Sequence, residues 1–240
     1  MKAHTISDAF RACIGEREVT SAFFTTYSFE PDFFELEVIP LLLGDQALSS
    51  QSDIRSVQLQ ALMQDKGRRF AVVHDVDVFN TKKKKSLEVD YLPVPISGGC
   101  QHAKMAILVL QEKGDQIPTI LLVAGSFNLT KAGWWDNIEV GHFVELQATR
   151  APANILEPMR RALRFFQAAA PTAVLDQIVN VQAGWLASAD DPDCSFYFSG
   201  AASNRLAFLD FIGQCPHTLP AAKDAATLES LRVEFLGKQG

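Results

Sequence analysis

Three apolar stretches that follow one another closely constrain the fold of this chain more than any other feature. They span Gln101–Leu110, Thr119–Ala124 and Ile138–Glu145. Runs of this length that are rich in Val, Ile and Leu and bounded by polar segments are typical of buried strands. The middle of the chain therefore predicts neighbouring strands of one sheet, joined by hairpin-sized connections.

Helices and strands alternate in the residues before this set. We expect helices over Ser7–Ile14, capped by Ser7 or Asp8, over Pro31–Leu36, limited or kinked by Pro40, and over Asp53–Lys66, and strands over Val19–Tyr27 and Phe70–Phe79. Such alternation followed by hairpin strands indicates an α/β fold, in which a mixed β-sheet is flanked by helices on both faces.

The C-terminal part predicts further elements and a domain boundary. The expected elements are helices over Ala153–Ala170, Val174–Leu186 and Asn204–Ile212 and a strand over Ser195–Gly200. Residues 189–193 have the composition of a linker. We therefore expect one domain over residues 1–188 and, over 189–240, a linker and the start of a second α/β lobe.

Length and composition indicate a soluble globular protein. The 240 residues and a hydrophobic content of 48% suffice for a large core. No apolar run reaches the roughly 18–20 residues that span a bilayer, and the start lacks the apolar core of a secretory signal. The four cysteines are scattered, which favours reduced thiols. These features predict a cytoplasmic protein without a membrane partner.

The charge balance bears on nucleic-acid binding. A formal net charge of −6 argues against a protein that coats nucleic acid nonspecifically. It does not argue against a local basic groove. The charge run Lys82–Lys85 lies just upstream of the first of the three stretches, where it either gathers a polyanionic substrate or forms a solvated loop.

Polar residues on and around the three stretches form the candidate site. His102 and Lys104 lie two residues apart, so a strand would place an imidazole and an ammonium on the same face. Ser126 and Asn128 follow the second stretch, where a hydroxyl and an amide can bind phosphoryl oxygens. Glu139 lies on the third. This set suits phosphodiester chemistry without a metal or another cofactor.

The order of these residues resembles the motif of the phospholipase D superfamily, in which H-x-K is followed by an Asp, then by G-S-x-N and N-x-E. The matching segments are His102-Ala103-Lys104, Gly125-Ser126-Phe127-Asn128 and Asn137-Ile138-Glu139. Val109 stands at the position of the Asp, which tyrosyl-DNA phosphodiesterases, one branch of the superfamily, also lack. The resemblance covers about residues 100–146.

The resemblance implies a role for each residue. His102 would attack phosphorus and form a phosphohistidine, with its ring oriented by a hydrogen bond to Glu139. Lys104 and Asn128 would stabilise charge on the phosphoryl oxygens, and Ser126 would add a hydroxyl. The family uses a second imidazole as the acid, yet the chain has a single H-x-K. A homodimer or a second lobe would therefore supply it.

Residues near the motif are further candidates. Trp134 and Trp135 are close enough to the motif to line the substrate entrance and stack on a base, although core packing is the better interpretation for at least one. Lys131 is placed either to contact a neighbouring phosphate or to be a plain surface lysine. Capping or loop contacts explain Asp75 and Asp77 better than a metal pair does.

Together these observations predict a metal-independent phosphodiesterase, a nuclease or an enzyme that processes DNA ends, with DNA favoured over RNA. One alternative is a phospholipase or phosphatidyltransferase, for which the sequence offers no identifiable amphipathic helix or apolar anchor. The other is a noncatalytic nucleic-acid-binding module of a larger assembly, which would keep the motif for phosphate recognition.

Overall fold

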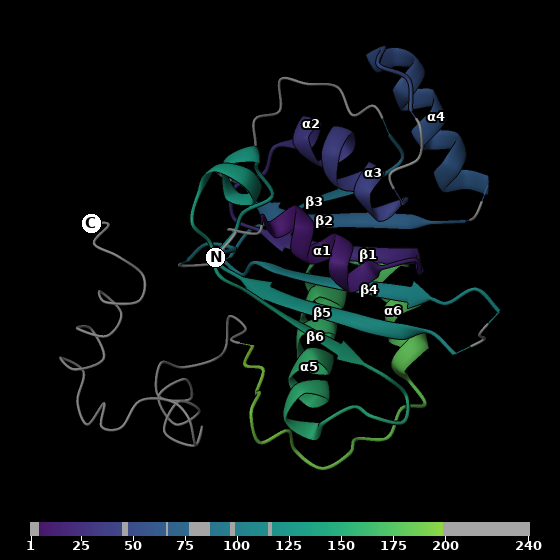
Figure 1. Cartoon of the computed structure of the whole chain (residues 1–240). Coiled ribbons are helices and arrows are strands. Elements are labelled where there is room, and N and C mark those ends of the chain that lie inside the picture. The colour runs from purple at the N-terminus through teal and green to yellow at the C-terminus, as the bar shows by residue number, and fades with distance from the viewer. Residues whose placement is uncertain are drawn as a thin grey trace.

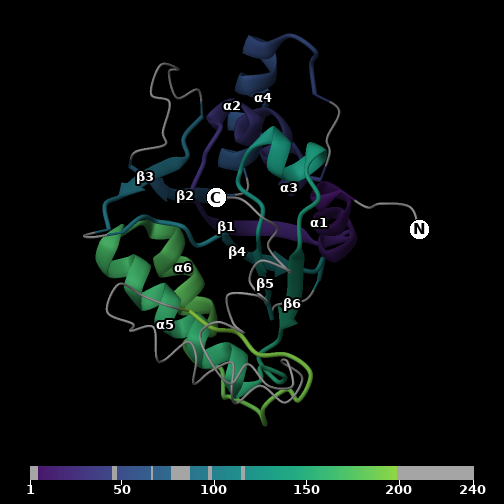
Figure 2. The ribbon, with the colours of Figure 1, turned by 90° about the vertical axis from the view of Figure 1, so that its left-hand side faces the viewer.

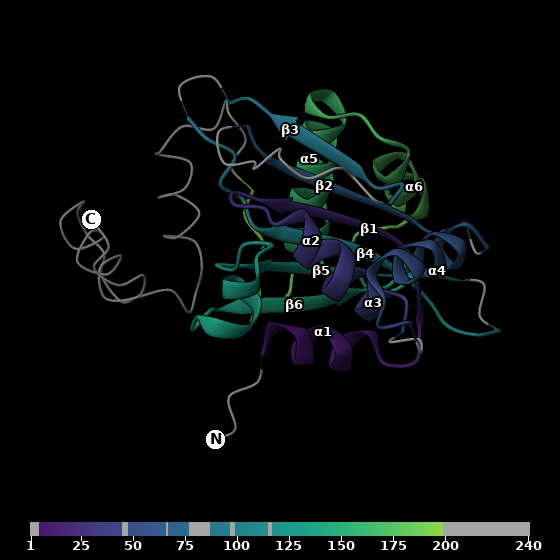
Figure 3. The same cartoon turned by 90° about the horizontal axis from the view of Figure 1, so that it is seen from above.

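A six-stranded mixed sheet forms the centre of the protein in the computed structural model, which describes residues 5–44, 48–65, 67–76, 87–96, 99–114 and 117–198. The strands are β1 (Glu18–Thr26), β2 (Arg69–Asp75), β3 (Asp90–Val94), β4 (Met105–Gln111), β5 (Thr119–Gly125) and β6 (Gly141–Leu146). Their order is β3-β2-β1-β4-β5-β6 (Figure 3). The pairs β1–β2 and β2–β3 are parallel and the other three are antiparallel.

Helices cover both faces of this sheet (Figures 1 and 2). One face carries α1 (Ile6–Ile14), α2 (Pro31–Phe33), η1 (Phe34–Val38), α3 (Ile39–Leu42), α4 (Ser52–Asp65) and η2 (Ala132–Asp136). The other carries α5 (Ala153–Ala169) and α6 (Ala173–Gln182). The predicted α/β class with a doubly covered mixed sheet is confirmed. Within the described residues, no helix is both long and apolar enough to cross a membrane.

Side-chain alternation along the strands divides the core into two layers. On β4, Ala106 and Leu108 pack toward α1–α4, whereas Ile107 and Val109 pack toward α5 and α6. All four are almost fully buried. Because successive strand residues point to opposite faces, a strand that is apolar throughout must be buried on both sides. This explains why β4 shows no polar alternation in the sequence.

Several predicted elements differ in detail from the observed ones. Thr5 caps α1 through a capping box with Asp8, so the cap lies outside the residues predicted for it. The helix that starts at Pro31 continues through the π-helical η1 to Leu42, and Pro40 neither ends nor shortens it. Strand β3 was not predicted, because Pro93 interrupts it. Proline is tolerated there since β3 is an edge strand.

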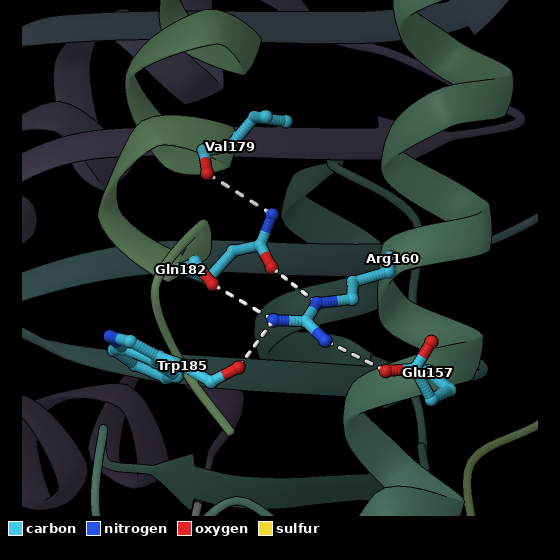
Figure 4. Close-up of polar contacts among 5 residues, drawn as sticks. All are labelled: Glu157, Arg160, Val179, Gln182 and Trp185. Atoms are coloured by element: carbon cyan, nitrogen blue, oxygen red, sulfur yellow. Dashed lines mark hydrogen bonds and ion pairs between the residues drawn. The ribbon is translucent and has the colours of Figure 1, made fainter. Parts of the chain in front are cut away.

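A half-buried guanidinium joins the two helices of the second layer (Figure 4). Arg160 of α5 donates to Gln182 Oε1 at 2.6 Å, to the Gln182 carbonyl at 2.9 Å and to the Trp185 carbonyl at 2.9 Å. Its third nitrogen bonds Glu157 at 2.7 Å. Arg160 thus donates to the last carbonyl of α6, which has no partner within the helix, and to the Trp185 carbonyl in the turn that follows.

The chain after α6 packs back on the same domain as far as the structure describes it. The Asn154 amide donates to the carbonyls of Asp191 and Cys194, both at 2.9 Å. Phe196 and Phe198 contact the core layer of α5 and α6. Residues 195–198 form no strand, which corrects that part of the predicted Ser195–Gly200 strand. The remainder of the predicted second lobe lies outside the described residues.

Candidate active site

The strand register brings all motif segments to one end of the sheet. Thr25 pairs with Met105, Met105 with Ala124, and Ala124 with His142. Strands β1 and β5 therefore end, and β4 and β6 begin, at the same end of the sheet. The segments that carry His102, Asn128 and Glu139 lie at this end.

His102 and Lys104 come together just before β4 rather than within it. Lys104 Nζ lies 3.3 Å from Nδ1 and 3.3 Å from Nε2 of His102, and it donates to the His102 carbonyl at 3.1 Å. The predicted strand start at Gln101 is wrong, since β4 begins at Met105. The predicted proximity of imidazole and ammonium is confirmed. His102 is exposed and Lys104 is half-buried.

An aromatic ring that the sequence analysis missed adjoins this pair. The rings of Tyr27 and His102 lie 5.2 Å apart between centroids, and Lys104 Nζ is 5.9 Å from the centre of the Tyr27 ring. A cation near an aromatic face is attracted by its quadrupole. The position of Tyr27 at the end of the predicted first strand was the available signal, but a strand end alone does not indicate a partner.

The local charges favour a neutral imidazole. Burial lowers the pKa of His102, the Lys104 charge lowers it further, and the Asp75 charge opposes both. Burial also lowers the pKa of Lys104, against the opposing charge of Glu139. A nearby cation disfavours a second positive charge. The lone pair of the His102 ring is therefore available at pH values below the ordinary pKa of histidine.

Neighbouring strands anchor the segment that holds His102 and Lys104. Asp75, at the end of β2, accepts a hydrogen bond from the Gln101 amide at 2.7 Å. The Gly125 amide of β5 donates to the Lys104 carbonyl at 3.1 Å. The predicted loop contact of Asp75 is therefore observed, whereas Asp77 and Lys82–Lys85 lie outside the described residues.

The Asn128 side chain has a defined orientation. Its Oδ1 accepts from the backbone amides of Tyr27 at 3.3 Å and Ser28 at 3.1 Å, and the Thr26 hydroxyl lies 3.3 Å away. Since two backbone donors meet Oδ1, the Nδ2 group faces the other way. Nδ2 forms no hydrogen bond to the part of the chain that the structure describes, so both its protons are available to a ligand.

Glu139 and Ser126 form a second polar group beside the first. The Ser126 hydroxyl donates to Glu139 Oε2, and the Val140 amide donates to Ser126 Oγ at 3.0 Å. Asn137 Nδ2 donates to Glu139 Oε1 at 3.3 Å. Glu139 precedes β6, so its predicted place on a strand is wrong. No hydrogen bond joins Glu139 to His102 among the described residues, and the orienting role of Glu139 stays a prediction.

A close backbone approach explains why residue 133, within η2, is a glycine. A Cβ atom added to Gly133 would lie 2.6 Å from the Asn128 carbonyl oxygen and 2.9 Å from the Asn128 nitrogen. Only glycine allows such an approach without a shift of backbone. The Gly133 amide donates to Thr130 Oγ1 at 3.1 Å, which further ties η2 to the Asn128 segment.

Trp134 does not line the site, which corrects its predicted contact with substrate and confirms the core packing predicted for at least one of the two tryptophans. It is 2% exposed, and its ring stacks on Phe10 at 4.9 Å between centroids. An indole packed in this way has no face left for a base. Trp135 is 40% exposed, with its Nε1 donating to Ser7 Oγ at 2.9 Å. Lys131 is exposed, and its contact with a phosphate stays a prediction.

Val109, at the position of the family's Asp, lies far inside the fold. It is 2% exposed and pairs with Ser21 of β1 and Ile120 of β5. Its side chain belongs to the apolar layer under α5 and α6. A carboxylate there would be desolvated, which is costly unless a partner is present. The departure from the family pattern therefore concerns the core and not the segments that carry His102, Asn128 and Glu139.

The other described histidines are engaged elsewhere. His74 is buried, its Nδ1 lies 2.9 Å from the Asp75 carbonyl, and its ring stacks on Phe29. His142 Nε2 lies 3.1 Å from Cys194 Sγ. No group of three or more His, Cys, Asp or Glu side chains suited to a metal ion occurs among the described residues.

Two exposed apolar side chains flank Glu139. Ile138 is fully exposed, at 103%, and Val140 is 73% exposed. No exposed apolar anchor was predicted, and these two side chains correct that expectation. Both residues belong to a predicted strand, Ile138–Glu145, whose first residues lie outside β6.

Comparisons with known proteins find distant structural likenesses. No family model matches the chain, and no curated protein matches it in sequence. A mutant of yeast tyrosyl-DNA phosphodiesterase matches with a TM-score of 0.45 and 12% identity, over 85% of this chain and 44% of that one. The phospholipase D family member Nuc from Salmonella typhimurium gives 0.32 and 17%, over 75% and 84%. The chain thus spans less than half of the yeast protein. With TM-scores this low, the motif and its geometry alone support the resemblance.

Proposed function

We propose that this chain is a phosphodiesterase of the phospholipase D type, in which His102 forms a covalent phosphohistidine without a metal. The observation that supports this most strongly is the Lys104 ammonium 3.3 Å from both ring nitrogens of the exposed His102. The cation favours the neutral, nucleophilic ring. It is also placed to offset charge that develops on phosphoryl oxygens.

The reaction would proceed in two steps. A ring nitrogen of His102 bonds to phosphorus while the bond to the leaving oxygen breaks, and an acid transfers its proton to that oxygen. Water then attacks phosphorus, the nitrogen–phosphorus bond breaks, and a proton from the water returns to the acid. Lys104 Nζ and Asn128 Nδ2 donate to the nonbridging oxygens, and the Ser126 hydroxyl would add a further bond once it turns away from Glu139.

The acid would be His102 of a second copy, because the described histidines nearby are engaged elsewhere. The exposed apolar pair Ile138 and Val140 supports a contact between copies at this place, since such exposure beside a site marks interaction surfaces. Light scattering should find a dimer, and Val140→Glu should lose both the dimer and the activity. Val57→Glu, at a 70% exposed valine on α4, is the matched control.

A monomer that is fully active would contradict the dimer. A Val140→Glu variant that remains dimeric and active would contradict the assignment of Ile138 and Val140 to the dimer interface. If activity appears only in a longer protein that contains a second H-x-K, the acid comes from a second lobe instead. His142→Ala should leave turnover unchanged, and its loss of activity would identify His142 as the acid.

Nucleic acid, and DNA rather than RNA, is the substrate that we propose, with action as a nuclease or on DNA ends in the cytoplasm. The support is the resemblance to the tyrosyl-DNA phosphodiesterase branch and the exposed Lys131 three residues after Asn128. A phosphate-rich polymer would meet this cation next to the site. A noncatalytic module would bind the same polymer and release no product.

A substrate panel tests this proposal. Single-stranded DNA, duplex DNA, RNA, tyrosyl-linked DNA and phosphatidylcholine are incubated with the chain in excess EDTA, and an acid-labile, alkali-stable phosphohistidine is sought during turnover. We expect DNA hydrolysis and a trapped intermediate. Hydrolysis that stops in EDTA and returns with magnesium or zinc would contradict the mechanism. Cleavage of phosphatidylcholine alone would favour the phospholipase.

A further inference from the structure

The two halves of the motif are held by two adjacent side chains of β1. Pairing of β1 with β4 ends at Thr25 and Met105. Beyond this point the Thr25 hydroxyl takes over, donating to the Ala103 carbonyl at 3.0 Å and accepting from the Met105 amide at 3.1 Å. Ala103 lies between His102 and Lys104, so one buried hydroxyl holds the peptide that carries both groups.

Thr26 serves the other half in the same way. Its hydroxyl accepts from the Leu129 amide at 3.0 Å and donates to the Ser28 carbonyl at 2.7 Å. The Ser28 amide in turn donates to Asn128 Oδ1 at 3.1 Å. Thr26 is fully buried, so no water competes for these bonds. The turn after β1 and the loop of Asn128 are thereby joined through one side chain.

Thr25 and Thr26 are consecutive residues of β1. Successive residues of a strand point to opposite faces, so the two hydroxyls leave β1 in opposite directions. One peptide unit then sets how far His102 and Lys104 lie from Asn128. We propose that Thr25 and Thr26 are positioning residues for the phosphodiester chemistry, an inference that rests on the proposed function.

Hydroxyl deletion at constant shape tests the proposal. Thr25→Val and Thr26→Val keep the branched side chain and remove the bonds, Thr25→Ser and Thr26→Ser restore them, and Thr20→Val is the control. Thr20 lies on the same strand, and its hydroxyl donates to the Val109 carbonyl at 3.4 Å, away from the motif. We expect kcat to fall about tenfold to a hundredfold in the valine variants, with KM little changed. The serine variants should recover most of it.

Titration of His102 by NMR gives a readout that needs no substrate. Once Thr25 no longer holds Ala103, the ring moves away from Lys104, and the pKa of His102 should rise toward its ordinary value in Thr25→Val and return in Thr25→Ser. If the wild-type chain hydrolyses no substrate and the pKa shift of His102 still occurs, the proposed function fails and the positioning role stands.

Valine variants that lose only thermal stability, with wild-type kcat and wild-type titration of His102, would overturn the proposal, because both residues would then be ordinary core threonines. Should a valine variant fail to fold, the alanine variant at the same position is measured instead under the same criteria. A wild-type rate in that folded variant overturns the proposal equally.

Discussion

The His102 end of the sheet and the layer of α5 and α6 are stabilised in opposite ways. At the His102 end the backbone ladders stop, and single side chains such as Thr25, Asp75 and Asn128 hold neighbouring segments. The α5–α6 layer consists of apolar side chains that are almost fully buried. Arg160 adds four hydrogen bonds to this layer.

This difference implies that activity and stability can be separated by mutation. Loss of one hydrogen bond at the site end should displace a residue of the candidate site, but it removes little buried apolar area. Loss of a contact between α5 and α6 reduces the free energy of unfolding and leaves the site end in place. Effects of the two kinds should add, because the residues involved share no partner.

The largest effect that we expect is that of His102→Ala on turnover. Removal of the attacking imidazole should reduce kcat by roughly 10⁴-fold or more, since no other group can form the covalent bond. The exposed ring contributes little to folding, so the free energy of unfolding should stay within about 0.5 kcal/mol of wild type. Steady-state kinetics and urea unfolding measure both. Normal turnover by the folded variant would end the assignment of the nucleophile.

Lys104→Met should have the next largest effect. Loss of the ammonium removes charge stabilisation in the transition state, for which a cost of about a hundredfold or more in kcat is typical. It also removes one of the two influences that lower the pKa of His102. The ring then stays protonated to higher pH, so the acid limb of the pH–rate profile should move to higher pH. A limb that stays in place would show that Lys104 does not act on the ring.

The same contrast determines what could be predicted from the sequence. Apolar runs such as Thr119–Ala124 and periodic segments such as Ala153–Ala170 were correct within a few residues, because burial determines them. The proximity of His102 and Lys104 was predicted from a strand, although both residues lie just before β4. The bonds of Thr25 and Thr26, and the identity of Gln101 as the partner of Asp75, were not predicted, because each joins backbone groups distant in sequence, and a threonine in a β-rich run has no special signal.

Misplaced expectations have equally specific causes. Trp134 was expected near substrate from its distance along the chain, but the π-helical η2 turns it toward Phe10 in the core. The edge strand β3 was missed because Pro93 is a strand breaker everywhere except at an edge. In both cases a tertiary contact determines the structure, and the local sequence pattern holds no information about that contact.

Arg160→Met tests how the α5–α6 layer is stabilised. Four hydrogen bonds of the half-buried guanidinium are lost, and the Gln182 and Trp185 carbonyls each lose a donor, so the free energy of unfolding should fall by about 2 kcal/mol. Arg164→Met is the matched control, because Arg164 is exposed on the same helix. Urea unfolding gives the difference. The activity per folded molecule should be unchanged in both, and a reduced kcat in Arg160→Met would show that the two regions are coupled.

Asp75→Asn should give the smallest effect and the sharpest test of the site end. The amide keeps an oxygen that can accept from the Gln101 amide, so the anchor persists, while the negative charge is removed. That charge raises the pKa of His102, against burial and Lys104. Without it the pKa falls, the neutral ring forms at lower pH, and the acid limb of the pH–rate profile should move to lower pH with kcat at the plateau nearly unchanged.

The control for this shift is Asp90→Asn. Asp90 is a carboxylate on β3 that accepts from the Thr172 hydroxyl near α6, remote from His102. Its removal changes the net charge by the same amount, so a general charge effect would move both profiles alike. A shift in Asp75→Asn alone assigns the effect to the site, and it must be opposite in direction to that of Lys104→Met, because the two charges have opposite signs.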